Sequence, residues 1–233
     1  MGRIVPSGGC NLLDEESDPI LNEIFSLSKS KTPKVVYLPT ASFDVEDSKD
    51  LIEERFKSFG CSEFEMLYLT DKTLTEKDIE KCILSADIIY VGGGNLKFLM
   101  DTWTETNAVK YFKIAFQQDI VLSGSSSGSL CWFQRGYDDC GENSTFMFID
   151  CMGFMPYCNC PHYDSEWWKS FDEAVKKQDL SGVAIDNDTA LSYCDGKYRV
   201  IKAYDEKSAY FFDANKNYEM CDITEILVDG KFD

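Results

Sequence analysis

The chain has 233 residues, of which 44% are hydrophobic and 14% aromatic, so it can bury a substantial core and lacks the composition of a disordered chain. Its 41 Asp and Glu residues outnumber its 23 Lys and Arg residues, and the resulting net charge of −18 argues against a nucleic acid as partner. No apolar run approaches the roughly 18 to 20 residues that span a bilayer, and residues 1–6 resemble a first strand rather than a signal peptide. We therefore expect no membrane contact and a cytoplasmic location.

Strand and helix patterns alternate through the first half of the chain. Short apolar runs bounded by turn residues predict strands at 35–38, 64–69, 87–91 and 120–123. Apolar residues at helical spacing predict helices over 47–59, 75–85 and 108–118. This alternation predicts a parallel sheet covered by helices on both faces, with a ligand site at the carboxyl ends of the strands.

The last third of the chain has a different pattern. Residues 166–177 place Trp167, Trp168 and Phe171 on one helical face, which predicts a helix packed on the sheet. Short strands are predicted at 182–185, 190–194, 198–203 and 209–212. We expect them to form a C-terminal β-hairpin extension of the same sheet. Because no linker or repeat interrupts the chain, residues 1–233 are expected to form one domain, as a monomer or a homodimer.

The segment GSSSG at 124–128 follows the strand predicted at 120–123 and precedes a helix-compatible stretch. This is the Gly-x-Ser-x-Gly pattern of a nucleophile elbow, with Ser126 at its tip. A serine hydroxyl is a weak nucleophile, and such a turn projects it from a strand end towards a general base and nearby backbone N–H groups. The pattern also arises by chance in loops rich in Ser and Gly, so it needs support from the rest of the chain.

That support comes from a single histidine and a second Gly-rich loop. His162, in the segment CPHYD at 160–164, is the expected general base for Ser126. The loop GGGN at 92–95 follows the strand predicted at 87–91, and its N–H groups are suited to an oxyanion hole. The loop completes neither a Walker motif nor a G-x-G-x-x-G fingerprint, so we expect no phosphate-bearing cofactor.

These motifs, in this order, resemble those of the dipeptidase E and cyanophycinase family of serine peptidases. The resemblance spans most of the chain and includes SGG at 7–9, YLPTAS at 37–42 and IDNDTAL at 185–191. It implies an α/β three-layer sandwich with a mostly parallel sheet, similar to class I glutamine amidotransferases and flavodoxin-like, in which serine replaces the cysteine nucleophile. It also implies a nucleophile, a general base and oxyanion-hole N–H groups, which fall on Ser126, on His162, and on Ser127 with Gly93 or Gly94.

The third catalytic residue, which orients the imidazole, is not fixed by these motifs. Asp139 is the first choice, because part of the family is thought to place its acid between the nucleophile and the histidine. Asp186 is the second choice. Asn187 aligns best with a glutamate of the family and can orient the ring without carrying a charge. The remaining acids considered lie beside these three: Asp138, Glu142 and Asp188.

Two departures from the family pattern concern the elbow and the substrate. Family elbows usually read Gly-x-Ser-Ala-Gly-Ala, whereas this chain has Ser127 and Ser129, which makes Ser127 the rival nucleophile. Aspartate-specific dipeptidases resemble one another in an arginine shortly after the histidine, but here residues 164–169 read DSEWWK. We therefore expect small peptides with neutral or basic N-terminal residues as substrates. An aspartyl preference would require another cation, for which the candidates are Arg135, Lys169 and Lys176.

Ten cysteines raise the question of a metal or disulfide framework, particularly Cys158 and Cys160 beside His162. A zinc site needs three or four suitably spaced ligands, and the only histidine is already the expected base. Without a secretory signal, reduced thiols are the simplest interpretation. We expect no metal.

Two alternatives to a serine peptidase are considered. An α/β-hydrolase esterase orders its triad Ser, Asp, His with the histidine usually well downstream, whereas much chain follows His162 here. A catalytically degenerate family member would bind a peptide or small ligand without cleaving it. The altered elbow, the missing arginine and Asn187 keep this second alternative open, and the serine peptidase is the preferred interpretation.

Overall fold

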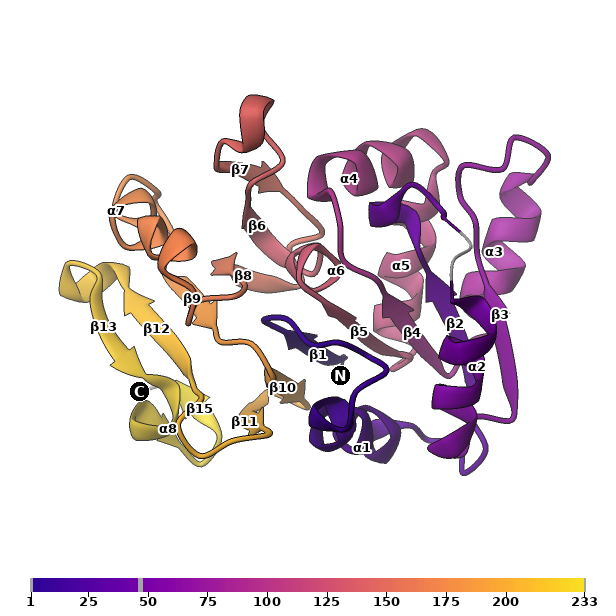
Figure 1. Ribbon diagram of the computed structural model, residues 1–233, viewed down its shortest axis with the longest axis horizontal. Coiled ribbons are helices and arrows are strands. Elements are labelled where there is room, and N and C mark those ends of the chain that lie inside the picture. The colour runs from indigo at the N-terminus through magenta and orange to yellow at the C-terminus, as the bar shows by residue number, and fades with distance from the viewer. Residues whose placement is uncertain (1, 46–47, 233) are drawn as a thin grey trace.

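The computed structural model describes residues 2–45 and 48–232 (Figure 1). Its larger sheet has seven strands. Their order is β11 (Lys197–Lys202), β10 (Thr189–Cys194), β1 (Arg3–Ser7), β5 (Val121–Ser125), β4 (Ile88–Val91), β2 (Lys34–Leu38) and β3 (Glu63–Met66). The five strands from β1 to β3 are parallel, whereas β10 and β11 run antiparallel to their neighbours.

Helices cover both faces of this sheet (Figure 1). One face carries α1 (Asp18–Leu27) and α2 (Lys49–Ser58), and the other carries α3 (Glu76–Leu84), α4 (Leu96–Glu105) and α5 (Ala108–Gln117). Because side chains alternate along a strand, β4 places Tyr90 in the core beneath α1 and α2, and Ile89 in the core beneath α3 to α5. A strand buried on both faces must be apolar throughout. Within the described residues, none of the helices has the length and apolar character needed to cross a membrane.

A second, six-stranded sheet lies beside the first (Figure 1). Its order is β13 (Glu219–Asp222), β12 (Ala209–Asp213), β9 (Gly182–Ile185), β8 (Met155–Cys160), β6 (Phe133–Asp138) and β7 (Met147–Asp150). A 3-10 segment (Glu166–Ser170) and α7 (Phe171–Val175) pack on this sheet through Trp168 and Phe171. The remaining α-helices and strands are short: α6 (Ser127–Leu130), α8 (Ile223–Ile226), β14 (Leu227–Val228) and β15 (Lys231–Phe232). Further 3-10 segments lie at Glu15–Ser17, Thr40–Ser42, Glu142–Ser144 and Ala214–Lys216.

The predicted α/β class with a mostly parallel sheet is confirmed. The hairpin of β10 and β11 extends that sheet as expected, but the strands predicted at 182–185 and 209–212 belong to the second sheet. A short apolar strand is compatible with either sheet, because its partner is chosen by long-range packing. The helix predicted at 166–177 is divided between the 3-10 segment and α7. The first residues predicted for the strand at 1–6 and the helix at 47–59 lie outside the described residues.

Candidate active site

Ser126 occupies the tight turn between β5 and α6. Its backbone has φ 55° and ψ −124°, a combination that costs residues with a Cβ on the order of 1–3 kcal/mol. The Ser126 N–H donates to the Ser7 carbonyl oxygen at 3.2 Å, which ties the turn to the end of β1. A Cβ on Gly128 would lie 2.1 Å from the Val91 carbonyl oxygen, so only glycine lets the turn pack against the end of β4. These contacts hold Ser126 at the carboxyl end of a central strand.

His162 lies just beyond the end of β8 and reaches Ser126 from the second sheet. Its N–H donates to the Gly8 carbonyl oxygen at 2.9 Å. Its Nε2 lies 2.8 Å from Ser126 Oγ. Close packing beneath the ring requires a glycine, because a Cβ on Gly9 would lie 2.3 Å from His162 Nδ1. The loops after β1 and β8 thus bring the only histidine to Ser126.

The other ring nitrogen, Nδ1, lies 2.6 Å from Asn187 Oδ1. Asp164 fixes the orientation of this amide, because its Oδ1 accepts hydrogen bonds from Asn187 Nδ2 at 2.8 Å and from the Asn187 backbone N–H at 3.0 Å. With Nδ2 donating to a carboxylate, the amide oxygen faces the ring, so Nδ1 carries the proton and Nε2 can accept one. Lys207 forms an ion pair with the other oxygen of Asp164. A network of polar contacts therefore runs from Ser126 through His162, Asn187 and Asp164 to Lys207.

The last two residues of this network, Asp164 and Lys207, stabilise each other in their ionised forms. Burial raises the pKa of Asp164, but hydrogen bonds from the Asn187 N–H and from Lys207 outweigh it, so the pKa lies below its ordinary value. The hydrogen bond to Asp164 raises the pKa of Lys207. Asp164 is therefore an anion and Lys207 a cation at neutral pH.

Of the three candidates for the third residue, Asn187 is the one that contacts His162 Nδ1. Asp139 lines a cavity that also borders Ser126 and His162, but Nδ1 is bonded to Asn187 instead. Asp186 accepts the Ser208 N–H at 3.0 Å. Adjacent residues at the end of β9 project in opposite directions, which sends Asn187 and not Asp186 towards the ring. The other two acids lie in different places: Asp188 in the wall of a cavity that His162 also lines, and Glu142 in an exposed 3-10 turn.

The Gly-rich loop after β4 lies against the turn that carries Ser126. A Cβ on Gly93 would lie 3.2 Å from Ser126 Cβ, and Gly94 has a φ of 145°. Ser127 Oγ lies 2.7 Å from the Gly94 carbonyl oxygen and joins the loop to the turn. Within residues 2–45 and 48–232, the backbone N–H groups of Gly93 and Ser127 have no hydrogen-bond acceptor. Both donors therefore remain available to a ligand.

Asp138, at the end of β6, is 1% exposed and faces Ser127. Its Oδ2 lies 2.7 Å from Ser127 Oγ, the hydroxyl that also contacts Gly94. A hydroxyl has one hydrogen, so both contacts are hydrogen bonds only when Asp138 is protonated and donates to Ser127. Burial raises the pKa of Asp138 to about 6, which agrees with this pattern.

We expect Asp138→Asn to stabilise the folded protein at pH 7.5. Because the folded-state pKa of Asp138 lies above 3.8, proton binding favours the folded state, and its ionisation destabilises the protein progressively from about pH 4 to pH 6. The amide keeps a donor for Ser127 and removes this penalty of up to about 3 kcal/mol. Urea unfolding should show roughly 1–3 kcal/mol of added stability at pH 7.5 and little at pH 4. An equal gain at both pH values would contradict the assignment.

Two cavities flank Ser126 and His162. The larger has a volume of about 840 Å³ and an apolar wall that includes Leu12, Leu13 and Tyr90. Its charged residues are Asp164, Asp188 and Lys207. The smaller has a volume of about 500 Å³ and is lined by residues that include Asp138, Asp139 and Trp168. Ser126 therefore lies where a bound molecule can extend to either side.

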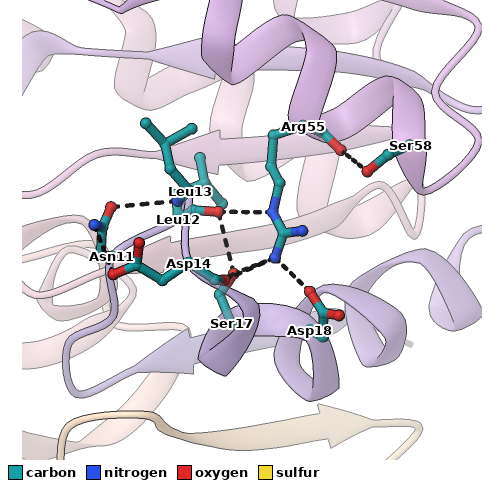
Figure 2. A network of polar contacts seen from close by, with 8 residues as sticks. All are labelled: Asn11, Leu12, Leu13, Asp14, Ser17, Asp18, Arg55 and Ser58. Carbon is teal, nitrogen blue, oxygen red and sulfur yellow. Dashed lines mark hydrogen bonds and ion pairs between the residues drawn. The ribbon is translucent and has the colours of Figure 1, made fainter.

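Figure 2 shows a network of polar contacts around Arg55. The network includes Leu12, which also lines the larger cavity. From α2, Arg55 donates to the Leu12 carbonyl oxygen at 2.9 Å and to the Asp14 carbonyl oxygen and Ser17 Oγ, each at 2.8 Å. It also forms an ion pair with Asp18. These contacts hold the segment that contributes Leu12 to the cavity, so Arg55 supports the wall rather than contacting a ligand.

The cations named from the sequence do not line either cavity. Arg135 pairs with Asp150 and Asp179, Lys169 lies 3.4 Å from the centroid of the Tyr163 ring, and Lys176 pairs with Glu173. Sequence reasoning missed Asp164 and Lys207. Asp164 had a signal, because it lies two residues after His162 in CPHYD, whereas no motif pointed to Lys207.

The cysteines form no disulfides: all ten carry free thiols. Cys158 and Cys160 are buried beneath α7, and burial raises the pKa of Cys158 to about 12. In the part of the chain that the structure describes, no group of three or more His, Cys, Asp and Glu side chains is placed to hold a metal ion.

A serine and a histidine lie in contact at the strand ends of a mixed α/β fold, an arrangement that serine hydrolases use. The chain belongs to peptidase family S51, whose family model matches residues 4–201. It is 28% identical over 215 residues to the uncharacterized peptidase YgaJ of Bacillus subtilis, covering 90% of this chain and 91% of that protein. It is 24% identical over 162 residues to the uncharacterized peptidase Lin0382 of Listeria innocua, covering 67% and 76%.

Solved structures show the same fold. A peptidase from an acI-B1 Actinobacterium superposes with a TM-score of 0.74 at 16% identity, covering 95% of this chain and 94% of that one. A putative peptidase E protein from Listeria monocytogenes EGD-e superposes with a TM-score of 0.64 at 18% identity, covering 87% and 98%. The family model that matches residues 4–201 confirms the predicted family.

Proposed function

We propose that the protein hydrolyses small peptides or peptide-like amides through an acyl-enzyme at Ser126. The observation that carries this proposal is the contact of Ser126 Oγ with His162 Nε2, with the ring fixed by Asn187 at Nδ1. Ser126 attacks the substrate carbonyl carbon while His162 accepts its proton, and His162 then protonates the leaving amine as the C–N bond breaks. Water, deprotonated by His162, hydrolyses the ester, and the proton returns to Ser126.

The Ser126 turn functions in this proposal as a nucleophile elbow. Charge develops on the substrate carbonyl oxygen in the tetrahedral intermediate, and donors preorganised around that oxygen stabilise it. The unoccupied N–H groups of Gly93 and Ser127 are the expected donors, because both flank Ser126. The hydrogen bond from Ser127 to the Gly94 carbonyl oxygen keeps the two donor segments together.

The charges of the two cavities favour a substrate with a cationic or neutral N-terminal residue. Among the described residues that line them, Asp139, Asp164 and Asp188 outnumber the one lysine, Lys207, which is already paired with Asp164. An aspartyl side chain would need a desolvated cation, most effectively a bidentate arginine, and Arg55 is committed to the cavity wall. Small peptides fit cavities of about 840 and 500 Å³.

We expect Lys- and Leu-initiated dipeptides to be hydrolysed with higher kcat/KM than Asp-initiated dipeptides. The measurement is amine release from matched dipeptides at low ionic strength, where the electrostatic preference is largest. Raising the salt concentration should narrow the difference between the Lys and Asp substrates. An aspartyl preference of tenfold or more, about 1.4 kcal/mol, would contradict the prediction and identify Lys207 as the cation to test.

Labelling by a fluorophosphonate probe tests the proposed nucleophile without knowledge of the substrate. Only an activated serine attacks phosphorus and expels fluoride at an appreciable rate. We expect one adduct per chain, on the peptide that contains Ser126, as determined by mass spectrometry. A chain that binds peptides from a dipeptide library without being labelled or releasing amine would instead be the degenerate binding protein.

A further inference from the structure

We infer that Asp164 is the anionic positioning residue of this site and acts on His162 through the side-chain amide of Asn187. The inference rests on the proposed function and deepens it, because it assigns the negative charge that a neutral third residue cannot supply. In a Ser-His-acid site, the carboxylate holds the imidazole and stabilises the imidazolium that forms during acyl transfer. An amide in that place performs the first task and lacks the charge for the second.

The contacts of Asn187 connect the ring to the carboxylate. One side of its amide meets His162 Nδ1 at 2.6 Å, and the other donates to Asp164 Oδ1 at 2.8 Å. The backbone N–H of Asn187 donates to the same oxygen at 3.0 Å, so the carboxylate holds both ends of the residue. Adjacent hydrogen bonds polarise one another. The Asp164 carboxylate that accepts from Asn187 Nδ2 therefore increases the negative charge that Asn187 Oδ1 presents to the ring.

The remaining charged groups near the ring are placed differently. Asp138 and Asp139 lie in the smaller cavity, and Asp138 is turned to Ser127. Asp186 accepts the Ser208 N–H, while Asp188 and Lys207 line the larger cavity. Of these carboxylates, none has a hydrogen-bond path to Nδ1 among the described residues, whereas Asp164 has one through a single residue.

Lys207 binds the carboxylate oxygen of Asp164 that Asn187 does not use. Its ammonium group pairs with Asp164 Oδ2 and leaves Oδ1 for the two donors of Asn187. The side chains of Lys207 and Asp164 are 22% and 23% exposed, so solvent screens this ion pair only in part. Lys207 thereby holds Asp164 in its ionised form and in the orientation that Asn187 requires.

The rate of fluorophosphonate labelling of Ser126 tests this inference in the full-length protein. In Asp164→Asn, the amide oxygen can still accept both Asn187 donors, whereas the negative charge and the ion pair with Lys207 are lost. We expect labelling to slow about tenfold or more, equivalent to about 1.4 kcal/mol. The matched control is Glu16→Gln, which removes one negative charge at an exposed position whose side chain accepts a hydrogen bond from Tyr204. The control should label at the wild-type rate.

A charge exchange separates an electrostatic role from a structural one. The double variant Asp164→Asn with Asn187→Asp moves the carboxylate into contact with the ring, and the amide introduced at position 164 can donate to it. We expect this variant to label at least as fast as wild type. Wild-type labelling in Asp164→Asn, or a double variant no faster than that single variant, would overturn the inference while leaving Ser126 as nucleophile. Failure of the wild-type protein to label would instead overturn the proposed function.

Discussion

Replacing Ser126 with alanine is expected to abolish amide hydrolysis and fluorophosphonate labelling. Loss of the nucleophile of a serine peptidase typically lowers kcat by about 10⁶-fold. The substitution removes only a hydroxyl, and the backbone contacts that hold the turn, including the Ser126 N–H to Ser7, do not depend on it. Circular dichroism and urea unfolding should therefore show a folded protein of nearly unchanged stability, while amine release falls to the uncatalysed background.

Ser127→Ala is the matched control, because it removes the neighbouring hydroxyl and keeps the backbone N–H. The Ser127 hydroxyl is buried and lies between the Gly94 carbonyl oxygen and Asp138, away from His162 Nε2. We expect its loss to lower kcat by less than about tenfold, since the N–H donor remains. Residual activity in Ser126→Ala together with inactivity in Ser127→Ala would identify Ser127 as the nucleophile.

The parts of the fold that the sequence predicted are those encoded by local pattern. Residues 88–91 of the strand predicted at 87–91 are apolar on both faces because β4 lies between two helical layers. The glycines at 124 and 128 are required by close backbone approach. Ser126 and His162 were found because a tight strand-to-helix turn and a unique histidine are visible in a single sequence. Carboxyl ends of parallel strands meet at one edge, so the placement of both loops there followed from the alternation.

The features that the sequence left undetermined depend on contacts between distant segments. The strand at 182–185 pairs with β8 and β12 in the second sheet, a choice set by packing across the whole fold. The third residue of the site was equally undetermined, because Asp139, Asp186 and Asn187 all lie near enough in sequence to reach the ring. The direction in which β9 ends selects Asn187, and Lys207 reaches Asp164 only because β12 pairs with β9.

Replacement of Asn187 is the second substitution that we expect to lower kcat strongly. Asn187→Leu, which keeps the branching of the side chain and lacks the amide, should lower kcat by roughly 10³–10⁴-fold, as when the wrong imidazole tautomer is held. The variant removes the acceptor at His162 Nδ1 and the hydrogen bond from Asn187 Nδ2 to Asp164. The measurements are kcat for a dipeptide and the rate of fluorophosphonate labelling, both at neutral pH.

Asp139→Asn distinguishes the two assignments of the third residue. Asp139 lines the smaller cavity, where its charge acts on the substrate and not on Nδ1. Loss of this charge should therefore raise KM for Lys-initiated dipeptides, because it weakens the binding of the substrate and of the transition state equally. The labelling rate should stay within a few-fold of wild type, because the contacts made only in the transition state are kept. If Asp139→Asn instead lowered labelling by about 10⁴-fold while Asn187→Leu did not, the acid before the histidine would orient the ring. The geometry predicts the reverse, since the Nδ1 proton has its acceptor at 2.6 Å on Asn187.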